Sequence, residues 1–237
     1  MIVNEIYKNN DKREILKSNM REREIISLKE ALAKNKNGPG IIGEYKRKSP
    51  SGFRNKSNTD IVKYFDAIKE IIAGISILTE PQYFGGNPLD AIAVQCYNKP
   101  ILIKDFISSN EMIDSSYMAG GDAYLLICDF LDYDKIKNMV QYGKKLGMEA
   151  LVEVHDKNSI KNIFPDENVI LGYNRRNLKT LKMDDNSLEL YDRLKSYGLP
   201  LVLESGITSE NIGRLHIEKY QGLLIGSSLL SGDIIRW

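Results

Sequence analysis

Ionisable and amide side chains end most of the apolar, strand-like runs in this sequence. The first run, 41–45, leads into Glu44-Tyr45-Lys46, where strand alternation places Glu44 and Lys46 on one face and Tyr45 on the other. The later runs end in Glu80, Lys104, Glu153, Asn174 with Arg176, and Glu204 with Ser205. One such residue alone would be a solvated loop charge. Together, if they converge, they predict a pocket of mixed charge that is suited to acid–base chemistry on an anionic substrate.

The convergence depends on the elements that carry these residues. Eight runs have the composition of strands, and they lie at 41–45, 75–80, 101–105, 123–127, 150–154, 169–174, 201–205 and 222–226. Helical patterns alternate with them, which favours parallel strands joined by helical crossovers. Eight units predict an α/β fold, a closed (β/α)8 TIM barrel, because closure leaves no sheet edge exposed and brings the carboxyl ends of all strands to one rim. A doubly wound open sheet is the alternative, but it would need a glycine-rich turn where the chain has Arg47-Lys48-Ser49-Pro50.

The N-terminal stretch precedes the first strand and has a different composition. Residues 1–36 are rich in Lys, Arg and Glu, with scattered apolar positions, and Asn37-Gly38-Pro39-Gly40 ends this stretch. The pattern predicts a mostly solvated helical arm on a single barrel domain that spans residues 1–237. We expect the arm to fold over the rim, since apolar positions such as Ile25 and Leu28 need a surface to cover.

Two glycine turns follow the last two strand runs. Ser205 and Gly206 come after the seventh run, and Gly226 and Ser227 come after the eighth. Glycine lets the backbone approach a ligand closely, and the start of a helix offers free N–H groups. The loops after strands seven and eight are the usual phosphate-binding position of this barrel. The two turns together therefore predict a phosphate site, although each turn alone would be an ordinary strand-to-helix connection.

Composition argues against several other classes of function. The net charge of +1 gives no global attraction to nucleic acid or to an anionic membrane, and no apolar run is long enough to span a bilayer. The two cysteines, and the histidines His155 and His216, lack the spacing of a metal site, so we interpret both histidines as structural or surface residues. No nucleotide-binding loop occurs, and we expect neither a metal nor another cofactor. The start at Met1 without a signal-peptide core predicts a cytoplasmic protein.

The strand ends also carry motifs that resemble one enzyme family. The most specific segments are Glu44-Tyr45-Lys46-Arg47-Lys48-Ser49-Pro50-Ser51, Lys104-Asp105-Phe106, Asn174-Arg175-Arg176-Asn177-Leu178 and Glu204-Ser205-Gly206-Ile207. In this order they are similar to the indole-3-glycerol phosphate synthases of tryptophan biosynthesis, and the resemblance covers residues 40–230. Tyr45 and Gly52-Phe53 depart from the family pattern, but neither removes a matched functional residue.

The resemblance implies a substrate, a reaction and a role for each matched residue. The substrate would be 1-(2-carboxyphenylamino)-1-deoxyribulose 5-phosphate, which closes to indole-3-glycerol phosphate with loss of carbon dioxide and water and without a cofactor. Lys104 would be the general acid at the ketone oxygen, and Lys46 would pair with the substrate carboxylate. The remaining expected residues are Glu153, Glu44 and Glu204 for proton removal and orientation of the lysines, Asn174, Arg176 and Glu80 for substrate binding, Phe84, Phe106 and Leu126 around the aromatic ring, and Ser51, Ser205, Gly206, Gly226 and Ser227 for the phosphate.

Two alternative functions, the oligomeric state and the contacts with other enzymes stay open at this point. A sister phosphate-binding barrel, such as phosphoribosylanthranilate isomerase, would not require Lys46 and Lys104 together. A catalytically dead subunit of a tryptophan-pathway complex would not need Lys104, Lys46 and Glu153 intact. We expect a monomer or weak oligomer, with contacts to other enzymes of tryptophan biosynthesis as a further expectation. Which group is the acid and which the base in the dehydration step is undecided.

Overall fold

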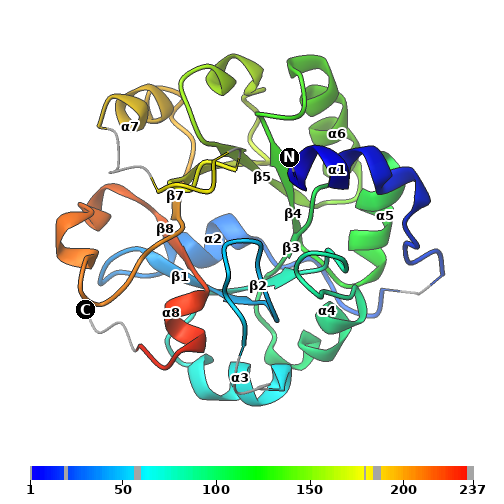
Figure 1. The fold of residues 1–237 in the computed structure, drawn as a ribbon, viewed down its shortest axis with the longest axis horizontal. Helices are drawn as coiled ribbons and strands as arrows, with labels where there is room; N and C mark the ends of the chain where they lie inside the picture. The colour runs from blue at the N-terminus through cyan, green and yellow to red at the C-terminus, as the bar shows by residue number, and fades with distance from the viewer. Residues whose placement is uncertain (1, 19–20, 56–59, 179, 184–187, 234–237) are drawn as a thin grey trace.

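A closed barrel of eight parallel strands forms the centre of the computed structural model, which describes residues 2–18, 21–55, 60–178, 180–183 and 188–233 (Figure 1). The strands are β1 (Gly40–Tyr45), β2 (Gly74–Leu78), β3 (Ile101–Lys104), β4 (Ala123–Ile127), β5 (Glu149–Val154), β6 (Val169–Asn174), β7 (Leu201–Glu204) and β8 (Gly222–Ile225). Each strand pairs with its neighbours in sequence, and the pairing of Ile42 with Leu224 between β1 and β8 closes the barrel. The predicted (β/α)8 barrel is confirmed.

Helices surround the barrel on its outside. They are α3 (Ile61–Ile68), α4 (Leu89–Ala93), α5 (Asn110–Met118), α6 (Tyr133–Lys145), α7 (Leu188–Lys195) and the short α8 (Ser227–Leu230), with 3-10 turns at Gln95–Tyr97, Ser159–Asn162, Ile212–Arg214 and Ile217–Lys219. Helix α3 begins where the Asp60 carboxylate accepts hydrogen bonds from the N–H groups of Val62 and Lys63. Within the described part of the chain, no helix is long and apolar enough to cross a membrane.

The strands divide their side chains between an inner and an outer core. Outward residues such as Ile103 on β3 and Leu126 on β4 pack with the helices, whereas Leu102 and Leu125 pack inside the barrel. This division follows from the two-residue period of a strand. The inward positions at mid-barrel are apolar, and the next inward positions towards the rim are polar on most strands. They carry Glu44 on β1, Lys104 on β3, Glu153 on β5, Asn174 on β6 and Glu204 on β7.

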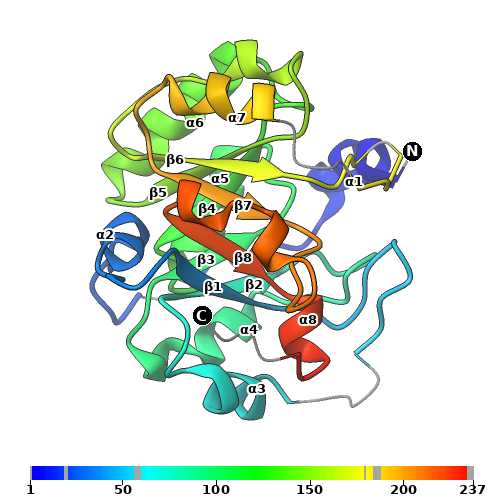
Figure 2. The same cartoon turned by 90° about the vertical axis from the view of Figure 1, so that its left-hand side faces the viewer.

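The N-terminal stretch differs from the single helical arm that its composition predicts. Two short helices, α1 (Ile2–Asn9) and α2 (Leu28–Ala33), lie at opposite ends of the barrel and are joined by a mostly non-helical segment, with one 3-10 turn at Asn10–Lys12 (Figure 2). Helix α2 packs on β1 and β2 and buries Leu28 completely. In the joining segment, Arg21 and Arg23 form ion pairs with the buried Asp122 at 2.5 and 3.0 Å. Charges that pair with the barrel in this way, between sparse apolar positions, favour an extended path over one continuous amphipathic helix.

Candidate active site

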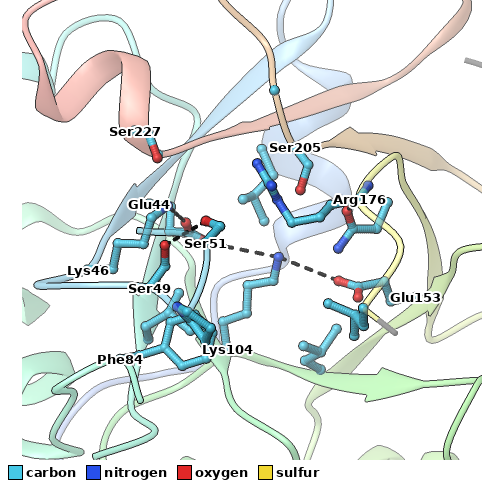
Figure 3. Close-up of a pocket in the computed structure, with 18 of the residues that line it drawn as sticks. Glu44, Lys46, Ser49, Ser51, Phe84, Lys104, Glu153, Arg176, Ser205 and Ser227 are labelled. Atoms are coloured by element: carbon cyan, nitrogen blue, oxygen red, sulfur yellow. Dashed lines mark hydrogen bonds and ion pairs between the residues drawn. The ribbon is translucent and has the colours of Figure 1, made fainter. Parts of the chain in front are cut away.

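A cavity of about 420 Å³ opens at the carboxyl ends of the strands, on the side where α1 and α8 lie. Its polar lining residues come from elements far apart in the sequence, and Figure 3 shows several of them pointing towards the centre. They are Glu44, Lys46, Ser49, Ser51, Lys104, Asp105, Glu153, Asn174, Arg176, Ser205, Thr208, Ser227 and Ser228. The convergence expected from the strand ends therefore occurs, and it depends on closure of the barrel.

Lys104 is the central cation of this site. Its ammonium contacts the Glu204 carboxylate directly and lies 3.5 Å from Glu153 Oε2 and 3.7 Å from Glu44 Oε2. All four side chains are buried or nearly so. Burial alone would lower the pKa of Lys104, but Glu204, Glu153 and Glu44 together raise it well above its usual range. The lysine therefore carries a proton at neutral pH, and it lines the cavity.

The pKa values of the carboxyl groups around Lys104 are shifted in different directions. Burial would raise the pKa of Glu44, but Lys46 and Lys104 outweigh that effect and hold it below its usual value. The pKa of Glu153 is also lowered, because Lys104 and His155 together outweigh its burial. Burial raises the pKa of Glu204 to about 8, and the neighbouring Glu153 adds to the rise. Glu153 and Glu204 thus differ in their affinity for a proton, which is low at Glu153 and raised at Glu204, a division suited to acid–base work.

Two glycines make room for these charged groups. A Cβ at Gly172, the inward position of β6 below Asn174, would overlap Glu204 Oε1. A Cβ at Gly226 would lie 2.5 Å from both Glu44 Oε1 and Lys46 Nζ. Those two atoms form an ion pair of 2.5 Å. The absence of a side chain at Gly226 therefore leaves room for this ion pair. The same glycine belongs to the turn that was expected to hold phosphate.

Asn174 and Arg176 extend the site along the end of β6. Asn174 Oδ1 accepts a hydrogen bond of 2.9 Å from the Arg176 N–H, and the Asn174 side chain also contributes to the lowered pKa of Glu153. Arg176 Nη1 donates to the carbonyl of Leu181 at 3.2 Å, and its guanidinium lines the cavity. Arg176 therefore places a second cationic group at the mouth, in addition to Lys46, where an anionic part of a substrate could bind.

The loops after β1, β7 and β8 carry the groups expected to bind phosphate. Ser51, Ser205, Gly206, Gly226 and Ser227 all line the cavity. Ser205 and Gly206 have φ angles of 71° and 64°, so two consecutive residues adopt the left-handed conformation. This conformation is costly for Ser205, and strain of this kind is concentrated at ligand-binding turns. Successive residues in such a turn expose backbone N–H groups that can bind an anion.

Apolar side chains form the remaining wall, and here the structure corrects the expectation for Leu126. Phe84 and Phe106 line the cavity with their ring centroids 5.9 Å apart. Leu126 instead packs outward in the helix-facing core, and its neighbours Leu125 and Ile127 line the cavity. The run 123–127 is apolar on both faces, so no polar residue marks which positions face inward.

Glu80 also lies outside the cavity lining, in contrast to its expected role in substrate binding. Its buried carboxylate accepts hydrogen bonds from the N–H groups of Gln82, Tyr83 and Phe84 at 2.7–3.0 Å. Glu80 thereby fixes the turn that presents the Phe84 ring to the cavity. Its contribution to the site is structural support for that aromatic wall.

Several lining residues were not identified from the sequence. Ile2, Val3 and Ile6 of α1 close the mouth of the cavity, and Leu178 lies after β6. The apolar side of α1 was a usable signal, since Val3 and Ile6 lie three residues apart. Within the described residues, no cluster of three or more His, Cys, Asp or Glu side chains is placed to hold a metal ion.

Fold and site together define a (β/α)8 barrel of the enzyme type, with a cluster of buried ionisable side chains and two glycine turns at its rim. Solved structures support the barrel at the level of fold alone. The 3-keto-L-gulonate-6-phosphate decarboxylase of Vibrio cholerae matches 81% of this chain and 90% of its own with a TM-score of 0.61 and 15% identity. A chain of the tryptophan synthase α2β2 complex from Pyrococcus furiosus matches 81% of this chain and 88% of its own with a TM-score of 0.56 and 14% identity.

Sequence comparison identifies the family. The family model described as indole-3-glycerol phosphate synthase matches residues 2–236. The indole-3-glycerol phosphate synthase of Picrophilus torridus is 58% identical over 99% of this chain and 94% of its own length. The enzyme of the same name from Thermoplasma volcanium is 43% identical over 96% of this chain and 93% of its own length, and that of Bacillus cereus is 36% identical over 83% and 79%. The chain belongs to the indole-3-glycerol phosphate synthase family, a family of carboxy-lyases in tryptophan biosynthesis.

Proposed function

We propose that the enzyme converts 1-(2-carboxyphenylamino)-1-deoxyribulose 5-phosphate to indole-3-glycerol phosphate in the rim cavity, and we assign the following roles to its residues. The observation that carries the proposal is Lys104, a buried and protonated ammonium that faces Glu44, Glu153 and Glu204 at the base of a cavity with an apolar wall. A ketone oxygen that becomes an alkoxide needs such a proton donor beside it. The family membership makes the overall reaction the expected one for this chain.

Substrate orientation follows from the distribution of charge around the cavity. The phosphate lies against the turns at Ser205–Gly206 and Gly226–Ser227, with Ser51 nearby. The aromatic ring lies against Phe84 and Phe106, and its carboxylate faces Lys46 and Arg176. This arrangement places the ketone between the two ends of the substrate, towards Lys104.

The reaction then proceeds through ring closure, loss of carbon dioxide and loss of water. The ring carbon that bears the carboxylate bonds to the ketone carbon, and the ketone oxygen takes a proton from Lys104. The carboxylate leaves as carbon dioxide, and its bonding electron pair returns to the ring. The hydroxyl formed from the ketone then takes a second proton and leaves as water. A carboxylate removes a proton from the neighbouring CH2 carbon, which gives the double bond of the indole.

The lowered pKa of Glu153 makes this residue the base in our proposal. Two groups can supply the proton for the leaving hydroxyl, Lys46 and Lys104. Lys46 is paired with Glu44, and Lys104 is in direct contact with Glu204, whose raised pKa favours uptake of a proton that can then pass to Lys104. Comparison of variants at Lys46 and Lys104 in single-turnover experiments would separate the two acids.

The test is formation of indole-3-glycerol phosphate by the purified full chain, followed by the fluorescence of the indole product. Turnover in the presence of a chelator supports the cofactor-free reaction. Absence of product from a folded chain that binds substrate would favour a catalytically dead subunit. Conversion of phosphoribosylanthranilate in the same preparation would favour the isomerase instead.

The remaining parts of the proposal concern the setting of the protein. The single-domain organisation of residues 1–237, a cytoplasmic location, a monomeric or weakly oligomeric state and contacts with other tryptophan-pathway enzymes stay predictions from the sequence. Size-exclusion chromatography with light scattering tests the oligomeric state. Co-purification from the source cell tests the pathway contacts.

A further inference from the structure

His155 is a buried residue that the reaction described above does not use. Its side chain is 1% exposed and lies between two carboxylates from neighbouring strand ends. Nδ1 is 2.8 Å from Asp129 Oδ2, beyond β4, and Nε2 is 2.9 Å from Glu153 Oε1, on β5. His155 does not line the cavity, whereas Glu153 does. Any effect of His155 on the reaction must therefore pass through Glu153.

The charge of the imidazole follows from the groups packed around it. Burial favours the neutral ring, but Glu153 and Asp129 outweigh burial and raise the pKa of His155 to about 9. Around Glu153 lie Lys104 of β3 and Glu204 of β7. Tyr7 of α1 has its buried hydroxyl near Asp105, Asp129 and Glu153, and it stays protonated because its pKa is raised. Near neutral pH the imidazolium can thus donate its Nδ1–H to Asp129, while Nε2 is in ion-pair contact with Glu153 Oε1 and has no hydrogen-bond partner in the described part of the chain.

The two oxygens of Glu153 consequently have different surroundings. Oε1 faces the imidazolium of His155, whereas Oε2 faces Lys104 at 3.5 Å and has no hydrogen-bond partner in the described part of the chain. A base needs one oxygen with a free lone pair directed at the substrate and a fixed orientation for the other. The arrangement provides both.

We propose that His155, held by Asp129, is a positioning residue that keeps Glu153 ionised and reserves Glu153 Oε2 for the proton taken from the substrate. The inference rests on the proposed function in that Glu153 acts as the base. In the reaction, the substrate proton moves to Oε2 while His155 keeps both of its own protons. Asp129 fixes the ring and prevents it from turning away from Glu153.

The expected pH dependence has a defined sign. In the folded protein the imidazolium is present at neutral pH and is lost as pH rises through about 9. If substitution of His155 removes the imidazolium, Glu153 binds a proton more readily. The acid limb of the kcat/KM profile then moves to higher pH. An opposite charge at this separation changes a carboxyl pKa by about 1–3 units.

The first experiment compares the pH profiles of His155→Gln and His216→Gln. Glutamine at 155 keeps a polar side chain but removes the charge. We expect the acid limb of His155→Gln to rise by about one to two pH units, with kcat reduced by roughly 10- to 100-fold and KM nearly unchanged. His216 is exposed, and the same substitution there should leave the profile unaltered. An acid limb of His155→Gln at the wild-type pH would overturn the inference, because a purely structural histidine would not move it.

The second experiment reads the charge of His155 without turnover. The chain has only two histidines, so ring ¹⁵N resonances assign unambiguously once His216→Gln removes one of them. We expect His155 to stay doubly protonated at pH 7 and to titrate near pH 9, and Asp129→Asn to lower that value. A neutral ring at pH 7 refutes the inference even if His155→Gln does not fold. Lack of synthase activity in the wild-type chain would instead refute the proposed function, which this titration does not measure.

Discussion

Substitution of Lys104 tests the centre of the proposed mechanism. In the proposed mechanism the wild-type ammonium gives a proton to the substrate, and its positive charge also faces three buried glutamates. Lys104→Met removes both properties. Lys104→Arg retains the charge, but a guanidinium does not release a proton at accessible pH. The pair of variants therefore separates general acid catalysis from electrostatic clamping.

The size of each effect follows from the geometry. With an effective dielectric constant of about 20, a unit charge at the 3.5 Å between Lys104 Nζ and Glu153 Oε2 contributes about 5 kcal/mol before the cost of burial is subtracted. Loss of that attraction in Lys104→Met raises the pKa of Glu153, so the base becomes protonated as well. The acid alone is worth roughly 10² to 10⁴ in kcat. We expect Lys104→Arg to lose about that factor with KM changed only a few-fold, and Lys104→Met to lose at least as much.

The assay is kcat and KM for indole-3-glycerol phosphate formation across a pH series. Lys144→Arg is the matched control, since Lys144 also pairs with two carboxylates, Asp166 and Glu167, but on the surface of α6. We expect the control to retain the wild-type constants. If Lys104→Arg keeps a near wild-type kcat, Lys104 is a charge clamp and the proton donor must be sought at Lys46.

Three further outcomes are expected. Ser227→Asp should raise KM for the phosphorylated substrate roughly tenfold or more by charge repulsion, whereas Ser231→Asp, at the other end of α8, should not; equal KM values would argue against phosphate at this turn. Gly172→Ala should lower kcat and destabilise the fold by about 1–3 kcal/mol in urea titrations, because the added Cβ overlaps the Glu204 carboxylate at the end of β7. Gly213→Ala is the control, since a Cβ at Gly213 has free space and the variant should behave as wild type. Removal of residues 1–9 should raise KM and leave cooperative unfolding intact, since α1 closes the mouth of the cavity; an unchanged KM would show that α1 has no part in binding.

The sequence predicted the location of most polar lining residues because these residues mark the inward faces of their strands. Glu44 and Lys104 are examples, since a charge at the end of an apolar run can only be accommodated at the rim. Leu126 shows where this reasoning fails. Both faces of β4 are apolar, and without a polar marker a shift of one residue exchanges Leu125 and Leu126.

The contacts of His155 and Glu80 were not predictable from the sequence for a different reason. The partner of His155 is Asp129, which lies 26 residues away in sequence and becomes a neighbour only when β4 and β5 pair. Glu80 looks like a rim charge, but its bonds go to the backbone of its own turn. Composition and spacing indicate that a charged residue lies near the rim, and the closed barrel decides which partner it meets.

The end of β3 links the acid of the proposed mechanism to the cover of the cavity. Lys104 projects inward, and the next residue, Asp105, holds the Arg13 guanidinium through bonds of 2.8 and 2.7 Å. Asn10 donates to the carbonyl of Phe106 at 2.7 Å, so the segment after α1 is fixed at successive residues of one strand end. A displacement of that strand end would move the acid, the aromatic wall and α1 together. Exclusion of water from the cavity and placement of the proton donor thus depend on the same short segment, which strengthens the case that α1 belongs to the active site.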